Sequence, residues 1–363
     1  MRALAALLVA LVALPASGQD LWSDLPASAL RTDRVLPTSF RALALDRAGM
    51  DARLATVPLE ARPGSLAGAV EVPIPLPDGE MAAVRLVESP IMEPGLQARY
   101  PQLRTYTGVL ADDPTTTVRV SVTPAGVGAW IMAPSGISVL DPVGQGTHMA
   151  YRRDAARAPE GWAEARAAEI VDYGPETRDV DHDHDHDHAP EASGAEARSV
   201  VADHGETLRL YRLAVGTTGE YTQFHGGTVE SAMAAIMVAM NRVNGLYERD
   251  VAVRMLLVDE NEKVVFTDPF TDPYTDGSPF SLFNENQAVI DDSIGTDNYD
   301  IGHVFSTGGG GVAGFGVVCR TGRKAQGVTG LPSPIGDPFY VDYVAHEIGH
   351  QFRASHTFNG NSG

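Results

Sequence analysis

The sequence predicts an α+β protein in which a β-rich region is joined by an acidic linker to a region that contains both strands and helices. Short strand patterns separated by turn residues fill residues 66–151. Residues 154–206 carry fifteen Asp and Glu against four Arg and are poor in large apolar side chains, which is typical of a solvated linker. After residue 207, strand and helix patterns follow one another. We therefore expect a β-rich region at 19–153, the linker at 154–206 and the second region at 207–363.

The first residues have the features of a secretory signal peptide. Arg2 precedes an apolar run at residues 3–14, and Pro15 and three small residues follow. This run is shorter than the roughly 18 apolar residues that a membrane span requires, and no later stretch is apolar enough to be one. We expect cleavage after Gly18 and a secreted protein. The formal charge of −20 argues against a nucleic-acid partner, because phosphate binding needs a clustered positive surface.

Within the β-rich region, residues 117–132 predict an antiparallel hairpin. Residues 117–122 alternate apolar and polar side chains, residues 123–126 supply turn residues, and residues 128–132 form the partner strand. This region has no cluster of His, Cys or paired carboxylates, so the sequence predicts no chemistry there.

The centre of the linker alternates Asp and His from residue 181 to residue 188. Such a tract can bind zinc, copper or nickel. A polar linker with only weak metal affinity is the simpler interpretation, and we favour it.

In the second region the patterns place five elements. We expect strands at 208–215, 251–258 and 299–306 and helices from Thr228 onward and at 286–294. The first helix has an apolar stripe at helical spacing, which we assign to the core: Val229, Met233, Ile236, Met237, Met240 and Val243.

Two loops of this region could bind a ligand. Asp268, Asp272 and Asp276 recur in a Thr-Asp repeat and could bind Ca²⁺, but no EF-hand pattern is present, and a plain surface loop is the favoured interpretation. The glycine run at 308–311 is followed by neither Gly-Lys-Ser/Thr nor a helix pattern, which excludes a phosphate-binding loop.

Cys319 is the only cysteine of a chain that we expect to be exported. Either it is buried as a small apolar side chain, or it belongs to a disulfide whose second cysteine lies outside this sequence.

A predicted amphipathic helix near the end of the sequence carries the chemistry. His346 and His350 are four residues apart, so both imidazoles lie on one side of this helix and can bind one ion. With Glu347 they form the HExxH pattern, in which the imidazoles bind zinc and the carboxylate takes a proton from the attacking water. The apolar side of the same helix consists of Tyr340, Val341, Val344, Ile348 and Phe352.

A catalytic zinc takes three protein ligands, so a third ligand has to come from outside this helical turn. His356 lies six residues beyond His350. A carboxylate is the alternative ligand, but no Glu follows Glu347 in this chain, and His356 is therefore favoured.

The segment from His346 to His356 resembles the extended motif HExxHxxGxxH of the metzincins. Residues 299–311, 316–319, 324–330 and 356–360 are similar to the bacterial reprolysin-like, or adamalysin-type, zinc metallopeptidases. The resemblance covers residues 207–363 well and the β-rich region more loosely.

This resemblance implies a metzincin-like catalytic domain with a mixed twisted sheet and flanking helices. It implies that His346, His350 and His356 bind one zinc ion and that Glu347 is the catalytic base. A polypeptide substrate would add as a further strand beside a glycine-rich edge strand that contains Gly308, Gly309, Gly310 and Gly311. The β-rich region would be an inhibitory or chaperoning propeptide, with the cleavage site in the linker.

Two features depart from the family pattern. Arg353 stands where the family has a Gly in left-handed conformation, at a cost of about 1 kcal/mol. The sequence ends seven residues after His356, before the methionine-containing turn of the metzincins. By the resemblance, the catalytic domain is cut short, the missing segment holds the partner of Cys319, and this chain is poorly active or inactive.

The sequence thus predicts the precursor of a secreted zinc endopeptidase. Two alternatives stay open: an exported metal-binding protein that uses the tract at 181–188, and a catalytically dead metzincin-like binding domain.

Overall fold

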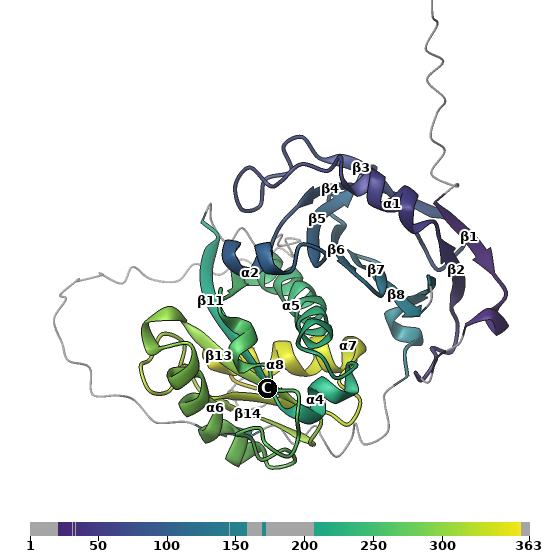
Figure 1. The fold of residues 1–363 in the computed structure, drawn as a ribbon. Coiled ribbons are helices and arrows are strands. Elements are labelled where there is room, and N and C mark those ends of the chain that lie inside the picture. Colours follow the sequence, from purple (N-terminus) through teal and green to yellow (C-terminus); the bar gives the residue numbers. More distant parts are fainter. Residues whose placement is uncertain are drawn as a thin grey trace, which may run out of the picture.

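The computed structural model describes residues 21–157 except 31, 33 and 145, together with residues 169–171 and 207–356. In these ranges, two sheets and their helices form the α+β architecture that the sequence predicts (Figure 1). The predicted signal peptide, the tract at 181–188 and residues 357–363 lie outside the described residues.

The first sheet has nine strands, and every neighbouring pair is antiparallel. Its strands are β1 (Trp22–Leu25), β2 (Arg41–Leu45), β3 (Val70–Pro75), β4 (Met81–Glu88), β5 (Arg104–Leu110), β6 (Thr117–Thr123), β7 (Gly126–Ala133), β8 (Gly136–Gly144) and β9 (Thr147–Arg152). Two helices, α1 (Arg47–Leu54) and α2 (Pro94–Arg99), and two 3₁₀ turns, Ala27–Ala29 and Arg153–Ala155, belong to the same part of the chain. The strand order is β1-β2-β9-β8-β7-β6-β5-β4-β3.

The hairpin that the sequence predicts is confirmed, because β6 pairs antiparallel with β7 with Val120 opposite Ala129. The sheet also extends further toward the N-terminus than the strand patterns indicate. Strands β1 and β2 pair with each other, and β2 pairs with β9, far away in sequence.

The second sheet is mixed and has six strands in the order β10-β14-β15-β13-β11-β12. Their bounds are β10 (Glu169–Val171), β11 (Arg209–Thr217), β12 (Val253–Leu257), β13 (Ile301–Ser306), β14 (Gly310–Gly314) and β15 (Gly327–Gly330). Strand β14 runs antiparallel to β15, and β10 runs parallel to β14. Strand β10 comes from the segment that the sequence predicts as a solvated linker, and it occupies the edge of the sheet beyond β14.

The helices of the second region cover both faces of this sheet, with α5 and α8 on one face and α6 on the other (Figure 1). They are α4 (Gly219–Phe224), α5 (Val229–Val251), α6 (Pro279–Ser293), α7 (Gly336–Phe339), a π-helical segment (Tyr340–Val344) and α8 (Ala345–Gln351), with 3₁₀ turns at Asn261–Val264 and Thr296–Asn298. The side chain of Thr228 caps α5 as predicted, and the methionines of the predicted stripe are buried in the core.

Several element boundaries differ from the prediction, and two of the differences have a clear physical reason. The strand expected from residue 251 begins at Val253, because α5 continues to Val251 and ends at Ala252, which has a left-handed backbone. The helix expected at 286–294 already begins at Pro279, whose fixed backbone angle suits a first helical turn.

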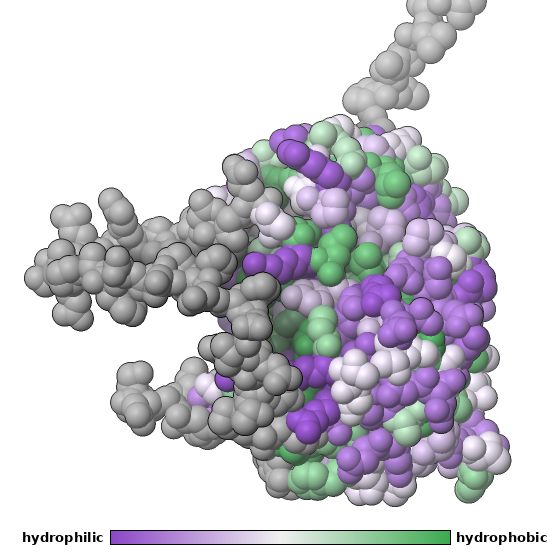
Figure 2. Space-filling model, turned by 90° about the vertical axis from the view of Figure 1, so that its left-hand side faces the viewer, coloured by the Kyte–Doolittle hydropathy of each residue, from purple (hydrophilic) through white to green (hydrophobic). Residues whose placement is uncertain are grey.

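The described surface is mostly hydrophilic on the side shown in Figure 2, with smaller groups of hydrophobic residues between. No helix within the described ranges has the length and apolar character that crossing a membrane would require.

Candidate metal centre

The predicted HExxH helix is confirmed and runs without a break from Gly336 to Gln351. Of its predicted apolar side, Tyr340, Val344 and Ile348 are buried, and Val341 and Phe352 pack half-buried against the same core. One stretch of it is π-helical rather than α-helical, so the side chains before and after this stretch are shifted around the helix axis.

The end of α8 is fixed to the sheet by a buried chain of hydrogen bonds. The amide of Gln351 donates from Nε2 to the carbonyl of Gly302 at 2.8 Å, and its Oε1 lies 2.9 Å from Nδ1 of His303. Since Oε1 only accepts, Nδ1 carries the proton, and Nε2 of His303 accepts from the hydroxyl of Thr329 at 2.8 Å. A side chain at position 327 would overlap Gln351 and His303, so Gly327 makes this contact possible.

The sequence did not predict these hydrogen bonds among Gln351, His303 and Thr329. The available signal was a histidine in the middle of an otherwise apolar strand, at position 303. A buried polar residue in such a place needs hydrogen-bond partners, and Gln351 and Thr329 supply them.

We expect the pH dependence of stability to report on His303. Burial lowers the pKa of its imidazole to about 4, so between about pH 6.5 and pH 4 the unfolded chain binds a proton that the folded chain does not. Stability is therefore lost as the pH falls through this window, by about 3 kcal/mol from His303 alone. In His303→Gln, the free energy of unfolding measured by urea titration should fall less steeply with decreasing pH. An unchanged slope would contradict a neutral, buried His303.

After α8 the chain reverses through a left-handed residue. Arg353 has a φ of 77°, the conformation that the family resemblance implies for this position. Its N–H donates to the carbonyl of His350 at 2.8 Å, and the N–H of Ala354 donates to the carbonyl of Gly349 at 2.8 Å. This turn brings His356 back toward the helix.

The turn brings the three predicted histidines together. Nε2 of His346 lies 3.0 Å from Nε2 of His350, and Nε2 of His356 lies 3.1 Å from each of them. His350 is buried, His356 is half-buried and His346 is partly exposed. The side chains thus converge through one nitrogen each.

The neighbours of His350 favour the unprotonated form of its converging nitrogen. Nδ1 of His350 lies 2.6 Å from the carbonyl oxygen of Ala354, which can only accept, so Nδ1 carries the proton and Nε2 has a free lone pair. Burial also lowers the pKa of His350, which favours the neutral imidazole. Neutral imidazole is the form that binds a metal.

Glu347 lies in the same helical turn and is completely buried. Neither of its carboxylate oxygens has a hydrogen-bond partner among the described residues, and burial raises the pKa of this carboxyl group well above its ordinary value. Its carboxylate points at β14, where a side chain at position 311 would overlap it. Gly311 therefore makes room for the carboxylate, a role that the sequence did not reveal.

The four predicted substrate-binding glycines lie in and beside β14. Gly310 and Gly311 begin this strand, and Gly308 and Gly309 precede it. The resemblance implies that this strand forms the edge of the sheet. In the structure, β10 already occupies that edge, and the N–H of Phe315 donates to the carbonyl of Val171 at 2.9 Å.

The sequence also singled out the predicted calcium loop and Cys319. Among the described residues, the three histidines are the only group of three His, Cys, Asp or Glu with ligand atoms close enough to share an ion. In the predicted calcium loop, Asp272 accepts from the N–H of Gly219 and Asp276 accepts from the hydroxyl of Thr218. The interpretation of Cys319 as a buried thiol is wrong, because its side chain is exposed in a turn.

The comparison with known families agrees with this geometry. Residues 233–357 match the metallo-peptidase family M12B, reprolysin-like, a stretch that runs from within α5 through the histidine-bearing helix and His356. No curated protein matches the chain. Over these residues, the chain is therefore similar to the reprolysin-like metallopeptidases of family M12B.

Proposed function

We propose that the protein is the precursor of a secreted zinc-dependent endopeptidase, in which His346, His350 and His356 hold the metal and Glu347 is the general base. The family is one of zinc-dependent metallopeptidases, so a polypeptide is the expected substrate. The observation that carries the proposal is the convergence of three Nε2 atoms at 3.0 to 3.1 Å beside a buried carboxylate.

The three nitrogens fit a metal better than they fit one another. In a neutral imidazole, each ring nitrogen either carries a proton or presents a lone pair. Among three such nitrogens at least two are of the same kind, so at least one of the three contacts joins two protons or two lone pairs. Hydrogen bonds among the histidines alone therefore leave one unfavourable contact. A cation accepts all three lone pairs, and ligand nitrogens about 2.0 to 2.1 Å from zinc in a tetrahedral site lie roughly 3.3 Å apart, close to the distances here.

Glu347 fits the role of proton acceptor. A bound zinc ion supplies Lewis-acid chemistry, since it polarises a carbonyl group and makes water a stronger acid. The carboxylate of Glu347 is buried and has no hydrogen-bond partner in the part of the chain that the structure describes. Its burial raises its pKa, which brings this pKa nearer to that of a base working at neutral pH. It can take a proton from the attacking water and hand it to the leaving amine.

The direct test is hydrolysis of a peptide library by a zinc-loaded form of the protein whose linker has been cleaved and whose β10 has left the edge of the sheet. We propose activity that a chelator removes and that added zinc restores, with products cut inside the peptides. Cleavage that survives complete zinc removal would contradict the proposal. Secretion is tested separately, by the N-terminal sequence of protein collected outside the cells, which should begin after Gly18.

The precursor part of the proposal rests on β10. An extended substrate would pair with the main-chain groups of β14, and β10 uses those groups. We therefore propose that β10 has to leave this edge before a substrate can bind.

Val171→Pro is expected to weaken β10, because proline has no N–H for the strand pairing. A peptide hydroxamate, which combines an extended peptide with a zinc-binding group, should then bind the zinc-loaded precursor about tenfold more tightly, since a larger fraction of molecules has a free edge. Isothermal titration measures this without requiring turnover. Val180→Pro, in the same linker but outside β10, is the control. Equal affinity of both variants and the unchanged chain would contradict competition by β10.

A further inference from the structure

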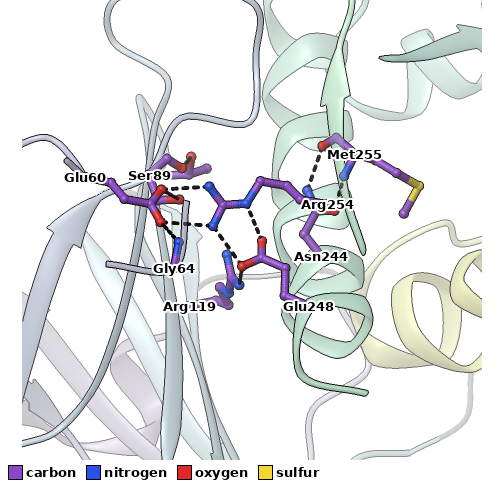
Figure 3. A network of polar contacts seen from close by, with 9 residues as sticks. Glu60, Gly64, Ser89, Arg119, Asn244, Glu248, Arg254 and Met255 are labelled. Atoms are coloured by element: carbon purple, nitrogen blue, oxygen red, sulfur yellow. Dashed lines mark hydrogen bonds and ion pairs between the residues drawn. The ribbon is translucent and has the colours of Figure 1, made fainter. Parts of the chain in front are cut away.

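The nine-stranded region contacts α5 and β12 through charged side chains that are almost completely buried. Figure 3 shows the guanidinium of Arg254, on β12, between two carboxylates. Its Nη1 donates to Oε2 of Glu60 at 2.7 Å, and its Nε donates to Oε1 of Glu248 at 2.7 Å. Arg119, on β6, forms an ion pair with Oε2 of Glu248 at 2.6 Å. The side chains of all four are between 3% and 11% exposed.

Each region supplies one Arg and one Glu to this network. Glu248 and Arg254 belong to the second region, whereas Glu60 and Arg119 belong to the nine-stranded region. The second region keeps its own pair if the regions separate, but Glu60 and Arg119 each lose the partner that compensates their burial. Separation would hydrate these charges again, so the network adds little net stability by itself, but a joined state that lacks one of its members would leave the partner buried and uncompensated.

A second buried ion-pair cluster also joins the two regions. Arg242, on α5, pairs with Asp337 of α7 at 2.7 Å and with Asp141 of β8. The indole of Trp130, on β7, donates to the other oxygen of Asp337 at 2.9 Å. The helix that continues into α8 is thus held at its start by side chains of both regions.

Main-chain bonds and apolar packing cross the same boundary. The N–H of Leu257 donates to the carbonyl of Ile91 at 2.8 Å, and the N–H of Glu93 donates to the carbonyl of Leu257 at 2.8 Å. Residues 91–93 thereby form an isolated parallel bridge with β12, at the edge of the six-stranded sheet. Ile91 and Met92 are buried in the same apolar core as the methionines of α5. One hydrophobic core is therefore built from both regions, as in permanent complexes.

We propose that the nine-stranded region is a permanent partner of the second region: after cleavage of the linker, the two pieces stay together as a tight noncovalent complex. The surface formed by α5, β12 and Asp337 binds one occupant, residues 21–157 of this chain. The inference stands independently of zinc chemistry, because none of its contacts involves the three histidines. Two parts of the expected propeptide would therefore have different roles: the β-rich region would be retained, and strand β10 would be displaced.

The test uses the full chain with a site for a sequence-specific protease inserted after residue 190. After cutting, size-exclusion chromatography at micromolar and then nanomolar concentration and physiological salt should give one peak with both pieces in equal amounts. Two separate peaks would overturn the proposal.

A charge variant tests whether the buried network holds the pieces together. Glu60→Gln keeps the side-chain size and removes the charge opposite Arg254, and it should raise the dissociation constant of the cut pieces by at least about 30-fold. Lys263→Met, which removes an exposed ion pair with Glu260, is the control and should leave the constant unchanged. Equal constants for both variants would overturn the role of the network. If Glu60→Gln does not fold, co-elution of the unsubstituted pieces still decides the proposal.

Discussion

Glu347→Gln is expected to keep zinc bound while peptide hydrolysis falls by about 10²- to 10⁴-fold, the range typical of losing a general base. Glutamine has nearly the same size and fills the space beside Gly311, but it cannot accept the proton. The measurement compares turnover and zinc content of the two proteins in a form of the chain with measurable peptide hydrolysis. Zinc content serves as the control for an intact site.

Unchanged turnover in this variant would remove Glu347 from the role of base. A loss of zinc together with activity would instead indicate that the buried carboxylate supports the metal-binding geometry. The unpaired state of both oxygens predicts the first result, because no described contact of Glu347 holds a histidine in place.

His356→Ala is expected to weaken zinc binding by more than the roughly 10- to 100-fold that follows the loss of an outer hydrogen-bond partner, because it removes one of three direct ligands. The affinity is measured by competition with a coloured chelator, in a chain without residues 181–188 so that the His-Asp tract does not contribute. His225→Ala, which removes a histidine outside the triad, should bind zinc as before. Undiminished affinity in His356→Ala would point to another third ligand.

The local parts of the site could be predicted from the sequence. The spacing of His346 and His350 determines that they share a helix face, and this holds whatever surrounds the helix. His356 was chosen as the third ligand because no Glu follows Glu347 in the sequence. The left-handed Arg353, which turns the chain back toward the helix, has the conformation that the family pattern implies. The hairpin of β6 and β7 and the apolar stripe of α5 were equally local and were confirmed.

The parts that depend on distant pairing could not be predicted. Nothing local shows that β2 pairs with β9, or that three residues of an acidic linker pair with β14. The partners of buried charges could not be predicted for the same reason, since Arg254 and Glu60 are 194 positions apart. The exposure of Cys319 could not be predicted either, because it depends on how the loop around it packs, which a lone cysteine does not reveal.

The central claim is that the three histidines, and not the acidic tract, form the tight zinc site. It is tested most directly by the zinc content of the chain from which residues 181–188 have been deleted, measured after dialysis against a weak chelator. We predict one tightly bound zinc ion per chain. A protein that retains no tightly bound zinc after this deletion would contradict the account.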